Sequence, residues 1–501
     1  MKVYSERLDL HASDCPADHG SVGPGSAACR ACGCGGPAAL AVGDKVMADI
    51  SRRALLVGAA AAIVSPYLDL HATSAFAAEP KRSDRPLLLT NLRLFDGRGG
   101  LRENVSILVE GNRIAGLPGA DERVEGAEVI DCGGRLAMPG LIDAHWHTML
   151  CGITELAAMT SDVGYLYLVA GQEAERTLMR GFTSVRDAGG PSFALKQAID
   201  QGIVQGPRIY PSGAMISQTS GHGDFRMRHE VPAGLDDISY GERVGLAAIA
   251  DGRAQVLKRV REQLMLGASQ IKLMAGGGVT SSYDPIDTLQ YTEEELRAGV
   301  EAAEDWNTYV MVHVYTPRGI KRALRAGVRS IEHGQLADEE AVRMMADEGA
   351  WWSLQPFLAD VDANIKTGPD AKAKQEEVAR GTVRAYEMAK QFDVNTAWGT
   401  DILFSPQNLP TQGRQLAKLT PRFYEPLELL ATATGRNGEL LGLSGPRNPY
   451  DGKLGVIEPG ALADILVADG DPTESLDFLS DPDANLRIIM KDGRIYKDTR
   501  S

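Results

Sequence analysis

The chain has 501 residues, of which 44% are hydrophobic and 24% charged, and its formal net charge is −15 at pH 7. This composition is typical of a globular protein and excludes a fibrous or wholly disordered one. No run of Lys and Arg follows residue 90. Because clustered cations bind phosphate backbones, a nucleic-acid partner is not expected.

The first 77 residues contain the features of an export leader. The pair Arg52-Arg53 precedes a short apolar stretch, and Ala75-Phe76-Ala77 has the small-x-small pattern of a cleavage site. The apolar stretch is too short to span a membrane. These features resemble a twin-arginine-type signal over residues 47–77, which predicts cleavage after Ala77 and a periplasmic or secreted protein. An N-terminal helix is the alternative, although Pro66 interrupts it.

Residues 1–46 precede this leader, and we interpret them as an over-extended start or a disordered extension. They hold four of the six cysteines, including Cys29-x-x-Cys32-x-Cys34, a spacing compatible with a zinc knuckle. No matching Cys or His pair follows at zinc-finger spacing. Only Cys132 and Cys151 remain after cleavage, so disulfide bonds are not expected to hold the mature fold together.

Both ends of the mature chain have the pattern of short β-strands. Residues 86–138 alternate apolar and polar side chains between Gly, Asn and Asp turns, and the stretch from Gly455 to Met490 has the same texture. We therefore predict a small β-sandwich domain built from residues 78–138 and 446–501.

The middle of the chain, residues 139–445, alternates short apolar runs with helical stretches, which predicts a parallel sheet with helical crossovers. The apolar runs are Leu136–His147, Thr183–Asp187, Arg208–Ala214, Gln270–Met274, Tyr309–Val314, Ser330–His333, Trp351–Leu354 and Thr396–Asp401. Eight strands close a TIM barrel. The predicted fold is therefore α/β, a (β/α)8 TIM barrel with the small β-sandwich domain.

Side chains that carry chemistry follow the predicted strands at their carboxyl ends, where barrel enzymes place their active sites. His145 and His147 are two residues apart, so a strand would direct both to the same face. The alternative is a strand edge with two satisfied polar residues. The other strand-end positions are Lys272, His313, His333 and Asp401. Four of the six histidines after residue 77 thus lie at strand ends, which is not expected of scattered core histidines.

This set of residue types suits a metal centre. Imidazoles with a carboxylate favour zinc or a similar divalent ion, and two ions about 3.5–4 Å apart can share bridging ligands. Lys272 is unusual in its apolar strand, because burying an ammonium group is costly. It either extends to solvent or pairs with Asp401. Spacing and composition do not distinguish these possibilities.

The same positions resemble the ligand set of the binuclear amidohydrolase superfamily. Three stretches resemble its imidazolonepropionase-like branch, which includes Xaa-Pro dipeptidases and ochratoxin-hydrolysing amidases: Ile271–Val279, Gln290–Leu296 and Ser330–Gly334. The resemblance covers essentially the whole mature chain, including Gly455–Pro472, which is similar to the closing β-segment of that family.

The resemblance implies a particular division of ligands. Lys272 would carry a CO2-derived carbamate that bridges two divalent metal ions, expected to be Zn²⁺. His145, His147 and Asp401 would hold the more buried ion, and His313 and His333 the more exposed one. A hydroxide shared by the two ions would then be the nucleophile.

Two further residues receive catalytic roles from the resemblance. Asp401 would accept the proton of the attacking hydroxide and deliver it to the leaving nitrogen. His222, in Ser220-Gly221-His222-Gly223-Asp224, lies in a stretch similar to the family's strand-3 loop and would help to polarise the carbonyl oxygen. The alternative for His222 is a loop histidine that caps a turn.

The candidate substrate-binding residues are Tyr315, Tyr291, Tyr283, Arg226 and Arg228. Tyr315 stands where many relatives have a second histidine after the strand-5 ligand, so it is a candidate donor to the substrate. The two arginines would bind a carboxylate through paired N–H groups. The alternatives are a solvated charged loop for the arginines and a packed aromatic at a helix start for Tyr291.

The sequence therefore predicts an exported, metal-dependent hydrolase that cleaves an amide near a free carboxylate. Its small-molecule substrate would be a dipeptide, as for an Xaa-Pro-type dipeptidase or carboxypeptidase, or an N-acyl amino acid, and a homo-oligomer is expected. A second hypothesis is a hydrolase of cyclic amides, imidazolones or lactones, because the same site opens rings. A third is a binding protein that has lost catalysis, against which the intact ligand set argues.

Overall fold

The computed structural model describes residues 83–119, 122–231, 234, 237–364, 366 and 368–500. The description below concerns the unit Ala77–Ser501. The predicted export signal and the cysteine-rich segment before it lie outside the described residues, so both stay predictions. In the part of the chain that is described, no helix combines the length and the apolar character needed to cross a membrane.

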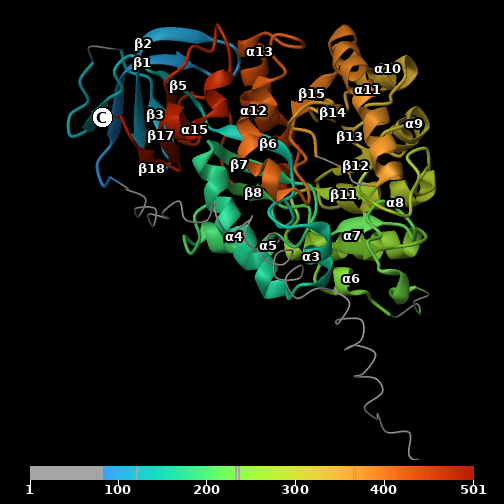
Figure 1. Ribbon diagram of the computed structural model, residues 1–501. Helices are drawn as coiled ribbons and strands as arrows, with labels where there is room; N and C mark the ends of the chain where they lie inside the picture. The colour runs from blue at the N-terminus through green and yellow to red at the C-terminus, as the bar shows by residue number, and fades with distance from the viewer. Residues whose placement is uncertain are drawn as a thin grey trace, which may run out of the picture. The chain divides into compact units, whose positions relative to one another are not determined.

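An eight-stranded sheet joins strands from both ends of this unit, in the order β18-β17-β16-β5-β1-β2-β3, with β4 beside β1. Its strands are β1 (Leu87–Phe95), β2 (Leu101–Glu110), β3 (Arg113–Gly116), β4 (Glu128–Asp131), β5 (Leu136–Pro139), β16 (Ile465–Ala468), β17 (Leu486–Lys491) and β18 (Arg494–Asp498). Strand β5 connects the two ends, because it pairs with β1 on one side and with β16 on the other. In Figure 1 the blue and the red strands accordingly lie side by side.

The remaining strands are parallel to their partners and form two sheets, β6-β7-β8 and β10-β9-β11-β12-β13-β14-β15. Their bounds are β6 (Leu141–Trp146), β7 (Phe182–Asp187), β8 (Arg208–Tyr210), β9 (Met215–Ser217), β10 (Ala247–Ile249), β11 (Ile271–Met274), β12 (Val310–Val314), β13 (Ser330–His333), β14 (Trp351–Leu354) and β15 (Asn395–Trp398). The predicted α/β class is confirmed by these sheets and the helices between their strands.

Helices lie between most successive parallel strands, as Figure 1 shows, and further helices follow β15, the last of these strands. The helices of the described residues are α3 (Glu155–Thr160), α4 (Val163–Met179), α5 (Phe193–Asp200), α6 (Tyr240–Arg243), α7 (Arg253–Leu266), α8 (Glu293–Glu304), α9 (Pro317–Arg325), α10 (Glu339–Asp347), α11 (Pro369–Gln391), α12 (Gln412–Ala417), α13 (Pro426–Ala431), α14 (Asn437–Gly442) and α15 (Pro482–Asn485). Short helical turns are η1 (Arg228–Glu230), η2 (Pro406–Thr411), η3 (Thr432–Arg436), η4 (Gly445–Arg447) and η5 (Asp477–Ser480).

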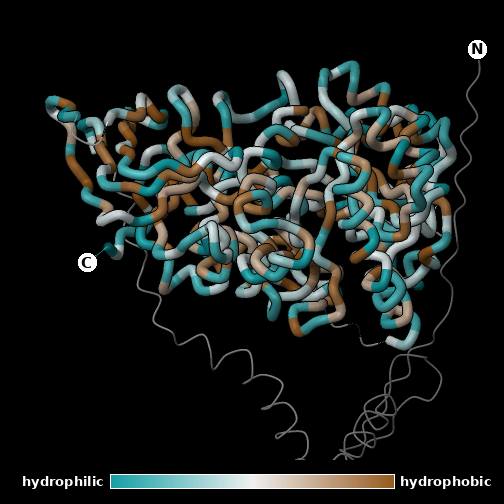
Figure 2. The backbone as a smooth tube through the Cα atoms, turned by 90° about the horizontal axis from the view of Figure 1, so that it is seen from above, coloured by the Kyte–Doolittle hydropathy of each residue, from teal (hydrophilic) through white to brown (hydrophobic). Residues whose placement is uncertain are grey.

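Helix α8 illustrates how the sequence dictates these elements. Thr292 caps it by accepting from the backbone N–H of Glu295, whose side chain accepts in return from the Thr292 N–H. Leu296, Val300 and Ala303 are buried at helical spacing. Because such apolar faces recur along the chain, hydrophobic segments are distributed throughout the unit in Figure 2.

The structure divides the segment that the sequence predicts as one strand, Leu136–His147. Residues up to Pro139 join the eight-stranded sheet as β5, whereas β6 begins at Leu141 in the three-stranded sheet. Gly140 makes this junction possible, because a Cβ there would lie 2.0 Å from the Thr183 Oγ1. One apolar run therefore passes from the small sheet into the strand that carries the candidate ligands.

A buried ion group links β8 to the loops of the eight-stranded sheet. The Arg208 guanidinium donates to Asp464 and Asp492, and its side chain is 1% exposed. The Asp464 side chain is 4% exposed and that of Asp492 is 38% exposed. A buried charge is costly without its partner. Asp464 should therefore contribute more than Asp492 to the stability of the contact between β8 and the eight-stranded sheet.

We predict that Asp464→Asn lowers the free energy of unfolding by about 3–5 kcal/mol, because it leaves the buried Arg208 charge undercompensated. Asp492→Asn is the matched control and should cost about 1 kcal/mol, because its carboxylate is partly solvated. Urea unfolding followed by circular dichroism measures both. Equal losses for the two variants would contradict the assignment.

Candidate active site

The six predicted ligand positions line one cavity of about 260 Å³. They are His145 on β6, His147 just after it, Lys272 on β11, His313 on β12, His333 on β13 and Asp401 in the loop after β15. The sequence placed Asp401 at the end of its strand, but β15 ends at Trp398. The backbone N–H of Asp401 donates to the His145 carbonyl oxygen at 2.9 Å, which holds this loop against β6.

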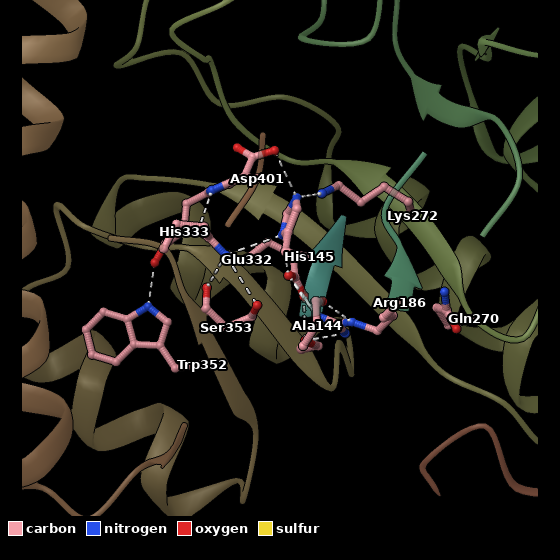
Figure 3. Close-up of polar contacts among 12 residues, drawn as sticks. Ala144, His145, Arg186, Gln270, Lys272, Glu332, His333, Trp352, Ser353 and Asp401 are labelled. Carbon is pink, nitrogen blue, oxygen red and sulfur yellow. Dashed lines mark hydrogen bonds and ion pairs between the residues drawn. The ribbon is translucent and has the colours of Figure 1, made fainter. Parts of the chain in front are cut away.

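The side chains converge closely enough to share cations. One ligand atom each from His145, His333 and Asp401 lie within 4.8 Å of one another. The His147 Nε2 lies 3.1 Å from the Asp401 Oδ1. Figure 3 shows Lys272 and Asp401 extending toward the His145 ring, and the Lys272 Nζ lies 3.4 Å from the His145 Nε2. The His313 ring centroid is 4.4 Å from that of His333. These nitrogen and oxygen donors fit a site for divalent metal ions.

Burial prepares these groups for metal binding. It lowers the pKa of His145 and His313 well below the usual range and that of His333 to about 3, so the imidazoles are neutral, as ligation requires. Burial alone would raise the pKa of Asp401, but His145 and His147 outweigh it and hold the carboxyl ionised. Burial also lowers the pKa of Lys272 to about 8, which increases the fraction of neutral amine.

A fully buried ion group that the sequence analysis missed lies behind His145. The Glu332 Oε2 is 2.7 Å from the His145 Nδ1, and the Arg186 Nη2 donates to both Glu332 oxygens at 2.8 Å. Ser330 also donates to Glu332 at 2.6 Å. A carboxylate at Nδ1 keeps that nitrogen protonated and leaves Nε2 free to bind a metal. The available signal was Glu332 itself, an acidic residue in a predicted strand directly before His333.

The backbone at His333 explains how neighbouring residues serve the same site. Successive strand residues point to opposite faces, yet Glu332 and His333 both reach His145. His333 has a φ of 73°, in the left-handed region that non-glycine residues rarely adopt. Asp401 has a φ of 52°. Strained residues of this kind concentrate at functional sites.

His222 lies against the cluster without belonging to it. Its ring stacks on that of His313 with 3.8 Å between centroids and an interplanar angle of 17°. The Nδ1 lies 2.6 Å from the Ser281 Oγ and 3.2 Å from the Asp284 Oδ2. Gly278 has to be glycine here, because a Cβ would lie 1.9 Å from the imidazole. The loop after β11 therefore fixes the ring beside the ligand cluster.

Comparison with known proteins agrees with this geometry. Residues 136–496 match the profile of the amidohydrolase family. The chain belongs to the amidohydrolase family. Together with the relatives described next, this membership makes it a hydrolase of amide-type carbon–nitrogen bonds.

Its relatives point to one branch of the family. The chain is 33% identical over 378 residues to the ochratoxinase of Aspergillus niger, a match that covers 72% of this chain and 75% of that protein. A crystal structure of a prolidase complexed with N-methylphosphonate-L-proline superposes with a TM-score of 0.75 at 35% identity, covering 83% of this chain and 100% of that one. A Xaa-Pro dipeptidase with bound methionine gives a TM-score of 0.71 at 28% identity, covering 82% and 100%. The amidohydrolase thus falls in the branch of ochratoxinase and the prolidases.

Four of the five predicted substrate-binding residues of this amidohydrolase lie outside the cavity. Tyr291 is 2% exposed and packs in the hydrophobic core. The Tyr283 hydroxyl donates to the Arg226 carbonyl oxygen at 2.9 Å, and the Arg226 guanidinium is held by Asp224 at 2.6 Å and 2.7 Å. Arg228 is exposed on η1. The structure therefore does not bring these four to the site.

Tyr315 does line the cavity, 3% exposed, with its ring 5.1 Å from those of His313 and His333. The wall is otherwise largely apolar, and its apolar members include Met215, Phe225, Val279, Phe357, Leu358 and Leu403. Such a wall favours a substrate with an apolar side chain or acyl group.

We predict that Glu332→Gln weakens zinc binding by about 10–100-fold, because the amide no longer fixes the His145 ring as a carboxylate does. Competition with a chromogenic chelator measures the affinity. Glu340→Gln is the control, since that side chain is 77% exposed on α10. Wild-type affinity in the Glu332 variant would show that the carboxylate does not position the ligand.

Proposed function

We propose that this amidohydrolase is metal-dependent and cleaves the amide bond beside a free carboxylate, in an Xaa-Pro-type dipeptide or an N-acyl amino acid. The observation that carries the proposal is the convergence of Lys272, Asp401 and the imidazoles in one largely apolar cavity. The similarity to prolidases and to ochratoxinase supports the amide substrate.

The donor set fits two divalent ions, and Zn²⁺ is the metal expected. In the proposed arrangement His145, His147 and Asp401 would hold one ion, His313 and His333 would hold the other, and Lys272 would be a further ligand as its carbamate. Bound ions of this kind lower the pKa of water and polarise a carbonyl oxygen. The neutral Lys272 amine forms the carbamate with CO2 and releases a proton. The resulting anion removes the cost of a buried ammonium.

The chain's own residues move the protons and orient the substrate. Asp401, ionised beside His145 and His147, accepts the proton of the attacking water and delivers it to the leaving nitrogen. His222, whose Nδ1 is held by Ser281 and Asp284, would help to polarise the carbonyl oxygen of the substrate.

The parallel sheets are proposed to close into a (β/α)8 barrel around this site. The 2.9 Å bond from the Asp401 N–H to the His145 carbonyl oxygen supports closure, because it joins the end of the seven-stranded sheet to the first strand of the three-stranded one. Closure would bring the carboxyl ends of all these strands to one rim.

We predict that protein prepared with zinc and bicarbonate hydrolyses dipeptides and N-acyl amino acids in preference to lactones and cyclic amides. Lys272→Ala should lose its bound zinc. Its activity should fall by more than about 100-fold, which is the upper end of the loss caused by removing a residue that only orients a ligand. Lys258→Ala, 70% exposed on α7, is the control. Preferred ring opening would favour the cyclic-substrate hypothesis, and undiminished turnover in the Lys272 variant would refute the metal assignment.

We predict that Asp284→Asn lowers kcat about tenfold with zinc content unchanged, because the His222 ring loses the carboxylate that holds it. Asp287→Asn is the matched control, since Asp287 is exposed in the same loop. Steady-state kinetics separate kcat from KM. A change in KM alone, or loss of zinc, would show that His222 does not act on the reacting carbonyl.

A further inference from the structure

Three lysines line the described part of the cavity wall, and they differ in environment. Lys272 belongs to the ligand cluster, and Lys372 is exposed near the start of α11. Lys366, in the segment after β14, is partly buried, and its Nζ donates to the Thr280 Oγ1 at 3.1 Å. Among these three lysines, Lys366 is therefore the one that is partly buried and lies outside the ligand cluster.

The Lys366 ammonium has no ion-pair partner among the residues that the structure describes. No described carboxylate oxygen lies within 4.0 Å of its Nζ, and its nearest charged influences, Glu155 and Asp401, act at longer range. By contrast, the cavity-lining Asp362 is neutralised by the Arg414 guanidinium, whose Nε lies 2.9 Å and 3.0 Å from its two oxygens. Burial lowers the pKa of Lys366, so an anion in the cavity would stabilise its charged form.

The loop that contacts both Lys366 and His222 indicates which anion Lys366 would bind. Thr280, which accepts from Lys366, directly precedes Ser281, which contacts the His222 Nδ1. One loop thus contacts both the ammonium and the imidazole, and both side chains line the same cavity. In a dipeptide or an N-acyl amino acid, a single carbon separates the scissile nitrogen from the carboxylate. A substrate carbonyl beside His222 would therefore leave the carboxylate in the same cavity, where Lys366 offers a partly buried cation.

We propose that Lys366 binds the free carboxylate of the substrate and so determines specificity for amides of amino acids. The inference rests on the proposed function, whose substrate class it narrows. It also replaces Arg226 and Arg228 in the role that the sequence suggested for them, since neither lines the cavity.

The test compares one N-acyl amino acid with its C-terminal carboxamide, which has nearly the same shape and no charge. In zinc- and bicarbonate-treated protein, Lys366→Met should lose about 10- to 100-fold in kcat/KM for the carboxylate, mainly through KM, because a charge-assisted hydrogen bond is removed. Its kcat/KM for the carboxamide should change little. Lys366→Glu should turn over the carboxamide better than the carboxylate.

Two control variants separate charge recognition from a structural role. Lys372→Met removes the exposed lysine of the same wall and should keep the wild-type ratio of the two substrates. Thr280→Val removes the hydrogen bond between the two loops and keeps the ammonium, so its preference for the carboxylate should persist. Equal losses for both substrates in Lys366→Met, or a preference abolished by Thr280→Val alone, would overturn the assignment.

Calorimetric binding of the same two compounds keeps this inference distinguishable from the proposed function. If wild-type protein turns over neither compound, the proposed substrate class is wrong. The role of Lys366 then still stands if the protein binds the carboxylate more tightly than the carboxamide and Lys366→Met abolishes the difference. Equal binding of the two compounds by wild-type protein would refute it.

Discussion

The contact between His145 and Glu332 is the interaction on which the rest of the site depends. An imidazole can ligate a metal only if it is neutral and correctly rotated. Burial keeps His145 neutral by lowering its pKa, and the carboxylate 2.7 Å from its Nδ1 fixes the rotation of the ring. That carboxylate is itself fully buried and is tolerable because Arg186 holds both of its oxygens. Removing either Glu332 or Arg186 would leave an uncompensated charge beneath the candidate metal site.

Two loops position the remaining side chains of the candidate site. The loop after β11 fixes His222 through Ser281 and Asp284, and Lys374 on α11 ties the loop down by donating to three of its carbonyl oxygens. The segment after β14 is anchored in turn by the pairing of Asp362 with Arg414. Most of the candidate ligands therefore lie on strands, whereas tethered loops carry His222 and Lys366, the proposed substrate contacts. This division lets one scaffold keep its chemistry while the loops set specificity.

Much of this arrangement could be predicted from the sequence, because it follows from local pattern. The parallel strands appear as short apolar runs, and His145 and His147 have the spacing that directs two side chains to one face. Glu332 and Arg186 were missed because their importance comes from pairing across distant strands, which no local spacing reveals. The left-handed backbone at His333 and Asp401 likewise has no signature in a single sequence.

The predicted substrate contacts mark the limit of such reasoning. Tyr291 and Arg226 lie near the right motifs in the sequence, but tertiary packing directs one into the core and the other to Asp224. Lys366 gave no signal, because a lysine between β14 and α11 looks like any solvated residue. Loop conformation, which decides these cases, depends on contacts with distant segments rather than on local propensity.

The most direct test of the central claim is anomalous diffraction at the zinc edge from crystals grown with zinc and bicarbonate. Our account predicts two peaks, one beside His145, His147 and Asp401 and the other beside His313 and His333, with density for a carboxylated Lys272. A single peak with an unmodified lysine, or ions bound elsewhere, would contradict it.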